Sequence, residues 1–142
     1  MNLIDYHLAT IDDLQAIIDT EPGLFDHEIK PERTREFLND PRHHLVLARE
    51  HDRIVGIASA LHYVHPDKDP WFFINEVGVL EAFQNQGIAR NMVRLLYDHA
   101  KSLGCVEVWV ATEHSNVAAR KAFTAAGGIE HPEPVVLINF PH

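Results

Sequence analysis

The chain has 142 residues, 46% of them hydrophobic, and its 21 acidic residues outnumber its 12 basic ones to give a formal net charge of −9. Such a length predicts a single domain over residues 1–142, and the acidic balance argues against binding to a nucleic-acid backbone. No apolar run approaches the roughly 18 residues of a membrane-spanning helix, no leader pattern opens the sequence, and Cys105 is the only cysteine, so we expect a cytoplasmic protein without disulfides.

The first half of the chain predicts strands separated by two helices. Thr10 followed by Asp13 supplies an N-cap and a first-turn carboxylate, which predict the start of the first helix. The polar group at residues 50–53 lies between two β-like runs and indicates an antiparallel hairpin. The predicted strands cover residues 3–8, 44–49 and 54–63, and the predicted helices cover residues 10–18 and 31–39.

The second half predicts alternating strands and helices. Residues 65–70 are expected to form a loop, because two prolines and two aspartates oppose a strand. After it we expect a strand at 71–79, an amphipathic helix at 87–103, a strand at 105–111, a helix at 116–126 and a last strand at 135–140. This order of elements predicts an α/β fold with a mixed sheet.

The turn that opens the long helix carries the most informative pattern. Gly87 and Ala89 are small, so the backbone N–H groups of the first helical turn stay uncovered and form an anion site at the positive end of the helix. Arg90 at the same end adds a charge-assisted contact to a phosphate. Taken alone, the pattern favours an ordinary strand-to-helix turn over an anion site.

Residues 84–89 read Q-x-x-G-x-A, which resembles the Q/R-x-x-G-x-G/A phosphate loop of the GNAT N-acetyltransferases. Downstream, Asn116 and Gly127 look like the ends of that family's N-x-x-A-x-x-x-Y-x-x-x-G segment. The resemblance spans roughly residues 45–140 and looks closest to the branch that includes aminoglycoside 3-N-acetyltransferases. It implies a GNAT-type fold: a central, mostly antiparallel mixed sheet with splayed middle strands and helices on both faces.

The resemblance also implies a site for acetyl-CoA, without a metal, between the strands at 71–79 and 105–111. The pantetheine would pair with backbone near Val77 and Val79, and Asn116 would hold the cofactor arm. An N–H near Val79 would donate to the thioester oxygen during catalysis. The implied cofactor-binding residues are Val77, Gly78, Val79, Gln84, Asn85, Gln86, Gly87, Ile88, Ala89, Arg90, Asn116 and Phe123.

Glu76 is the candidate base, because the resemblance places a carboxylate at this point of the strand beside the acceptor. Partial burial would raise its pKa and help it accept the amine proton; a structural role for Glu76 is an equal alternative. Phe123 stands where the family commonly has tyrosine, so a general acid is missing there. We favour water as the acid, with Tyr97 or Tyr63 as alternatives.

These features predict acetylation of a primary amine on a small acceptor, resembling the aminoglycosides of antibiotic resistance or a polyamine. A peptide or protein N-acetyltransferase and a non-catalytic acyl-CoA-binding module are the alternatives. The acceptor side is expected from the first helices and the segment 62–65. Asp67 and Asp69 offer an acidic mouth beside it, but an ordinary solvated turn is the favoured interpretation of these two residues. The sequence does not specify the acceptor, and a homodimer through the apolar last strand is expected only by analogy with relatives.

Overall fold

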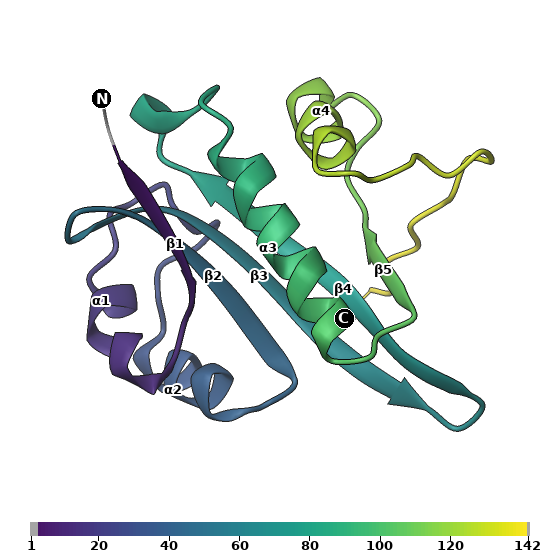
Figure 1. Cartoon of the computed structure of the whole chain (residues 1–142), viewed down its shortest axis with the longest axis horizontal. Coiled ribbons are helices and arrows are strands. Elements are labelled where there is room, and N and C mark those ends of the chain that lie inside the picture. Colours follow the sequence, from purple (N-terminus) through teal and green to yellow (C-terminus); the bar gives the residue numbers. More distant parts are fainter. Residues whose placement is uncertain (1–2, 142) are drawn as a thin grey trace.

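The computed structural model describes residues 3–141. Within them, five strands form one sheet in the order β1–β2–β3–β4–β5 (Figure 1). The strands are β1 (Ile4–Leu8), β2 (His43–Glu50), β3 (Arg53–His65), β4 (Lys68–Val79) and β5 (Glu107–Val110). Neighbours from β1 to β4 run antiparallel, whereas β4 and β5 run parallel. The predicted mixed, mostly antiparallel sheet is confirmed.

The helices begin where the sequence indicates. Thr10 and Asp13 form a reciprocal capping box, in which the Thr10 N–H donates to Asp13 Oδ2 over 2.8 Å. Pro31 is the first residue of the second α-helix, where an N–H group would have no partner within the helix, so proline costs no hydrogen bond. The helical elements are η1 (Ile11–Asp13), α1 (Leu14–Ile18), α2 (Pro31–Asn39), η2 (Glu81–Phe83), α3 (Ile88–Ser102) and α4 (Val117–Ala125). None of these helices combines the length and the apolar character that crossing a membrane requires.

Helix α3 packs across one face of the sheet and covers the main core (Figure 1). Its buried side chains recur every three or four residues, as an amphipathic helix requires. Gly56 of β3 lets the helix approach closely, since a Cβ there would lie 3.1 Å from the side chains of Ile88 and Met92. The buried residues of α3 are Ile88, Met92, Val93, Leu96 and Ala100.

A bulge in β4 changes the direction of its side chains before the strand ends. Ile74 pairs with Ala60 and Glu76 pairs with Ser59, so Asn75 has no partner residue in β3. An extra residue of this kind shifts the alternation of side chains between the two faces. Beyond it, Gly78 faces the loop between α1 and α2, where a Cβ would lie only 2.2 Å from the Leu24 carbonyl oxygen.

The prediction of a loop at residues 65–70 is wrong in detail. Strand β3 continues to His65 and β4 begins at Lys68, so only a two-residue turn separates them. Pro70 is tolerated in the strand because its backbone faces β5, and the pairing of β4 with β5 begins only at Trp71, so no ladder hydrogen bond requires an N–H from Pro70. Its carbonyl still accepts a hydrogen bond from Val106 N–H at 2.9 Å.

The predicted strand at residues 135–140 is absent. Residues 129–141 contain no helix or strand, and the apolar side chains of this stretch are 72–95% exposed. A β-like sequence forms a strand only when it finds a neighbour for its backbone, and this segment pairs with no other part of the described chain.

Three histidines that the sequence presents as unconnected meet between α3 and the sheet. His44 Nε2 lies 2.8 Å from His62 Nδ1, and His44 Nδ1 lies 3.1 Å from His99 Nε2. Burial, followed by the neighbouring His99 and His62, lowers the pKa of His44 to about 4. A neutral His44 satisfies both contacts by donating one hydrogen bond and accepting the other.

Candidate functional site

The edge of β4 that faces β5 is open over the last part of the strand. Strand β5 pairs with β4 only from Trp71 to Ile74, and beyond that point it leads away toward α4 (Figure 1). Leu80 N–H donates to Val55 of β3, so alternation along the strand turns the backbone groups of Val77 and Val79 toward the open edge. The two strands therefore splay and leave unpaired backbone groups in the gap.

Gln84 fixes the turn that follows this edge. Its side-chain amide donates to the Val79 carbonyl over 3.1 Å. One of the backbone acceptors at the open edge is thereby occupied, while the Val79 N–H faces the same edge as its carbonyl. Gln84 thus supports the turn through its side chain.

The turn into α3 forms an uncapped helix start. Asn85 and Gly87 both have left-handed backbone angles, with φ of 62° and 81°. Gly87 is the N-cap and no side chain caps the helix, so the N–H groups of Ile88, Ala89 and Arg90 lack intrahelical partners. A Cβ on Gly87 would lie 3.1 Å from the Arg90 guanidinium, which shows how closely that cation approaches the turn.

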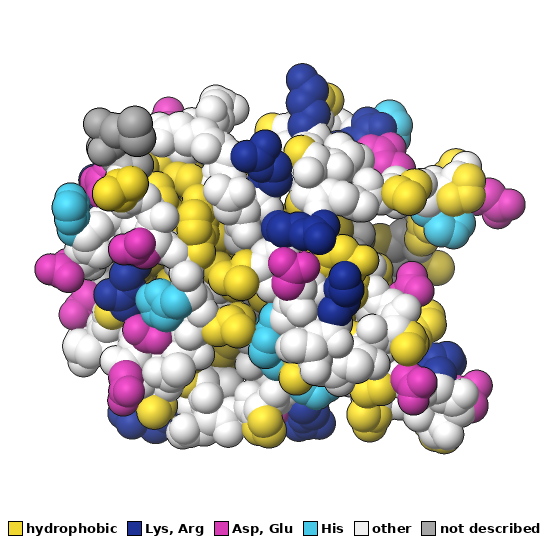
Figure 2. Space-filling model, in the orientation of Figure 1, with side chains coloured by type: hydrophobic (Ala, Val, Ile, Leu, Met, Phe, Trp, Pro, Cys, Tyr) yellow, Lys and Arg dark blue, Asp and Glu magenta, His cyan; other side chains and the backbone are white. Residues whose placement is uncertain are grey.

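A groove of about 320 Å³ runs between α3 and α4 beside this turn. Arg94, four residues after Arg90 and hence on the same helix face, donates to the Ala126 carbonyl over 3.4 Å. Figure 2 shows Lys and Arg side chains along α3 although the whole chain is acidic. The residues lining the groove are Arg90, Asn91, Arg94, Ala125, Ala126 and Gly127. Arg94 was not among the predicted site residues, although its spacing of four from Arg90 places it on the same helix face.

The two predicted site residues of α4 have local structural roles. The side chain of Asn116 accepts from Ala119 N–H over 3.1 Å and caps the helix. Phe123 is partly buried and packs against the core. The helix packs against α3, and its C-terminal end at Ala125 lines the groove, whereas Asn116 and Phe123 are not among the lining residues.

Glu76 faces the loop between α1 and α2. Its Oε2 accepts from the Asp26 N–H over 3.1 Å, and its own N–H donates to Ser59 Oγ over 3.2 Å. At the start of the same loop, Glu21 accepts two hydrogen bonds from Arg53, at 2.7 and 2.9 Å. The loop is therefore held to the sheet at Glu21 and at Asp26, and the carboxylate of Glu76 lies where the loop meets β4.

The expected acidic mouth at the β3–β4 turn is not beside Glu76. Asp67 contacts His65 and lies 3.2 Å from the Lys68 ammonium, so its charge is already paired. Lys68 and Glu76 stand eight residues apart on one strand, which is roughly 25 Å. The expectation that Asp67 and Asp69 form a mouth beside Glu76 is wrong, because β4 separates the β3–β4 turn from Glu76 by most of its length.

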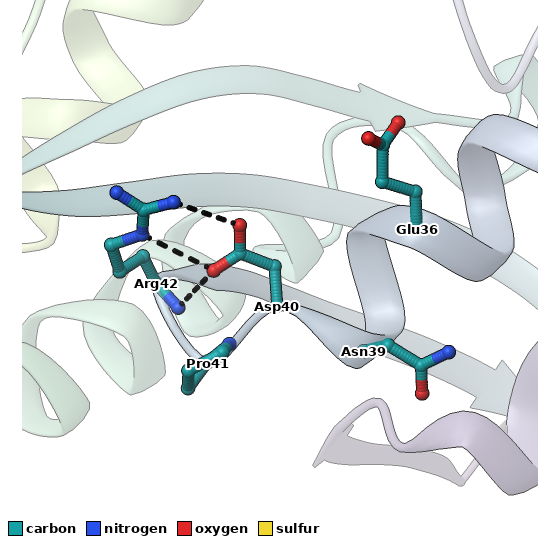
Figure 3. Close-up of a pocket in the computed structure, with 5 residues that line it drawn as sticks. All are labelled: Glu36, Asn39, Asp40, Pro41 and Arg42. Atoms are coloured by element: carbon teal, nitrogen blue, oxygen red, sulfur yellow. Dashed lines mark hydrogen bonds and ion pairs between the residues drawn. The ribbon is translucent and has the colours of Figure 1, made fainter.

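The hollow in Figure 3 lies elsewhere, where α2 turns into β2. It measures about 500 Å³ and is lined by Glu36, Asn39, Asp40, Pro41 and Arg42. Asp40 accepts hydrogen bonds from the Arg42 guanidinium and, over 2.9 Å, from the Arg42 backbone N–H, and these bonds lower the pKa of Asp40 to about 2. The two charges satisfy each other, so this hollow offers no free charged group of that pair for a ligand.

Comparison with known proteins links this geometry to one family. The model of the acetyltransferase (GNAT) family matches residues 11–127. An uncharacterized N-acetyltransferase of Mycobacterium tuberculosis is 24% identical over 102 residues, which cover 72% of this chain and 63% of that protein. The match therefore spans less than two thirds of the relative's length.

Solved structures share the fold. An aminoglycoside acetyltransferase from an uncultured soil metagenomic sample, in complex with trehalose, superposes with a TM-score of 0.86 at 18% identity and covers 97% of this chain and 95% of its own. AAC(6')-Iy, in complex with a bisubstrate analogue of CoA and acetylneamine, has a TM-score of 0.80 at 20% identity, with coverage of 98% and 99%. These likenesses show that the three proteins share one fold.

Proposed function

This chain belongs to the acetyltransferase (GNAT) family, and from that premise we propose that it transfers the acetyl group of acetyl-CoA to a primary amine of a small cationic acceptor. The observation that carries the proposal is the open edge of β4 running directly into the uncapped start of α3. A ligand with an amide-bearing arm and a diphosphate matches both parts of this surface at once.

The donor side of the proposal uses backbone groups. The N–H groups of Val77 and Val79 and the Val77 carbonyl point into the gap between β4 and β5, where pantetheine amides would pair with them in the manner of a strand. The N–H groups of Ile88 to Arg90, at the positive end of a 15-residue helix, suit the diphosphate.

The groove beside α3 supplies charge. Arg90 and Arg94 line it together, and guanidinium groups bind phosphate oxygens through paired hydrogen bonds. We expect Arg94, whose contact to Ala126 is long at 3.4 Å, to exchange that carbonyl for a phosphate of the bound cofactor. Arg94→Ala should weaken CoA more than pantetheine, which has no diphosphate.

In the reaction, acetyl-CoA supplies an acyl group activated as a thioester. The amine nitrogen forms a bond to the acyl carbon, the carbon–sulfur bond breaks, and the amine gives up a proton. Glu76 takes that proton directly or through water, and the Val79 N–H stabilises the negative charge on the acyl oxygen. Phe123 offers no proton, so water protonates the departing thiolate.

The acceptor side supports a cationic substrate. The loop that Glu76 contacts carries Asp26 and Glu28, both exposed, next to the end of β4. Carboxylates so placed would attract an amine-rich molecule, as does the overall charge of −9. Two of the proteins with this fold are aminoglycoside acetyltransferases, which favours an aminoglycoside-like or polyamine-like acceptor.

The test is release of free thiol from acetyl-CoA in the presence of aminoglycosides, polyamines or peptides with a free N-terminal amine. We expect release with amine-rich small molecules, and a fall of about 100-fold or more in turnover for Glu76→Gln without a change in CoA affinity. Glu81→Gln, an exposed carboxylate on η2, is the matched control and should retain full turnover.

Two results would contradict the proposal. Release with peptides alone would overturn the acceptor class, leaving a peptide acetyltransferase. CoA binding that raises the melting temperature without any thiol release would identify an acyl-CoA-binding module instead.

A further inference from the structure

An aromatic cluster spans β3, β4 and β5. Trp109 of β5 packs on Phe73 of β4, with ring centroids 4.4 Å apart, and its indole N–H donates to the Tyr63 hydroxyl of β3 over 2.9 Å. Trp71 of β4 completes the aromatic cluster, with its ring centroid 6.5 Å from that of Tyr63. Trp109 leaves 41% of its surface exposed. The cluster is therefore held in place by contacts among its own members and is still accessible to a ligand.

The aromatic cluster lies on the same face of the sheet as Glu76. Phe73 pairs with Leu61 and Glu76 pairs with Ser59, two residues away on β3. Paired residues share a face, and side chains two residues apart on a regular strand point to the same face. The bulge at Asn75 therefore brings Glu76 onto the face of Phe73, whereas unbroken alternation would have turned it away. Three to five residues of β4 separate Glu76 from the cluster, which is roughly 10–16 Å.

Glu107 adds negative charge beside the aromatic cluster. It pairs with Trp71 across the two strands, is exposed, and makes no ion pair within residues 3–141. Lys68 shows that a cation is attracted here, because its ammonium lies 5.6 Å from the centroid of the Trp71 ring. That ammonium is already balanced by Asp67 Oδ1, 3.2 Å away, whereas the charge of Glu107 is not balanced. Aromatic rings beside a free carboxylate are suited to an alkylammonium ion.

Apolar side chains fill the distance between Glu76 and Trp71. Phe73 and Leu61 lie side by side there and are both half-buried, so methylene groups can pack along them. Along this face a carboxylate is thus followed by an apolar stretch and then by aromatic rings with a second carboxylate. A linear polyamine has the matching order of amine, methylene linker and amine.

We propose that the aromatic cluster and Glu107 form a second ammonium subsite, which holds the far ammonium of an elongated acceptor while its near amine is acetylated beside Glu76. The inference rests on the proposed function, because it extends the acceptor side of that site along β4. It narrows the acceptor class from small cationic molecules to linear polyamines long enough to span the distance between Glu76 and the cluster. A compact amine reaches only one end of this surface.

The first test measures acetylation of linear diamines of increasing length, from ethylenediamine upward, and of spermidine and spermine. We expect kcat/KM to rise by about tenfold, through a lower KM, once the chain is long enough to reach the aromatic cluster. Trp109→Leu should remove this gain, so that long and short diamines become equal substrates, and Trp109→Phe should keep most of it. Val106→Ala, exposed at 59% just before β5, is the control and should keep the full gain.

Calorimetric titration with the same diamines in the presence of CoA, which has no acetyl group to transfer, separates this proposal from the proposed function. Affinity that rises with length in the wild type and not in Trp109→Leu supports the subsite even if acetyl-CoA releases no thiol, in which case the proposed function alone fails. Acetylation with equal affinity and equal kcat/KM for long and short diamines overturns the subsite and leaves the proposed function in place. A gain with length that Trp109→Leu retains, or no binding of any diamine, overturns the subsite as well.

Discussion

Gly78→Ala tests how the loop between α1 and α2 is seated on β4. The added methyl would lie 2.2 Å from the Leu24 carbonyl oxygen, and an ordinary contact needs 3.4 Å or more, so the loop must retreat by about 1 Å. Overpacking of this kind costs about 1–3 kcal/mol. With an unfolding entropy of about 0.3 kcal/mol/K for a chain of this length, the melting temperature should fall by about 3–10 °C.

The functional consequence should be confined to the acceptor side. A displaced loop loses the hydrogen bond from Asp26 N–H to Glu76, so we expect faster hydrogen exchange over residues 24–28 and a higher KM for the amine, with CoA affinity unchanged. Gly56→Ala is the control, because its methyl meets side chains under α3 and not the loop. Unchanged stability and unchanged loop exchange in Gly78→Ala would refute the packing of Leu24 on Gly78.

Two further predictions concern stability. Burial lowers the pKa of His44 to about 4 in the folded protein. As pH falls below about 6.5, the unfolded chain therefore binds a proton at His44 before the folded protein does. The contribution of neutral His44 to the free energy of unfolding, which is fully present above pH 6.5, is lost as pH falls toward 4. In urea unfolding, the free energy of unfolding of the wild-type protein should fall by about 2 kcal/mol between pH 7 and pH 5. His44→Gln should reduce this fall, and His27→Gln, at an exposed position, should leave it unchanged. An equal fall in the two variants would contradict the role of His44. Asn116→Ala should cost about 0.5–2 kcal/mol through loss of the α4 cap, and Asn116→Ser should recover most of it, whereas an Ala variant as stable as wild type would exclude the cap.

Local signals in the sequence predicted much of the fold. The capping residues Thr10 and Asp13, Pro31 at the start of α2 and Gly104 after α3 each act within one turn of chain, and the structure places the helix ends beside them. The turn at Gly87 was predicted from the small residues there, and the structure adds that Gly87 has the left-handed backbone that a glycine adopts readily.

Contacts between distant segments were beyond a reading of the sequence. The packing of Leu24 on Gly78, the hydrogen bond of Asp26 to Glu76 and the chain of three histidines join residues that no local pattern relates. The bulge at Asn75, which turns Glu76 toward the loop, depends on the register between β3 and β4 and leaves no mark in composition.

The errors have physical causes of the same kind. Pro70 argued against a strand, yet it lies in one because its backbone faces β5 just before the pairing with β5 begins, where no N–H is required. Residues 135–140 have the composition of a strand, but composition does not specify a pairing partner, and in the described part of the chain this segment pairs with no strand.

The central claim, that the β4 edge and the start of α3 together bind acetyl-CoA, is tested most directly by calorimetric titration with CoA. Wild-type protein should bind, and Gly87→Val should lose about tenfold or more in affinity, because the side chain crowds Arg90 and the free N–H groups. Gly104→Val, equally left-handed but at the other end of α3, controls for backbone strain and should bind as wild type does. Failure of wild type to bind CoA, or equal affinity in a folded Gly87→Val, would contradict the account.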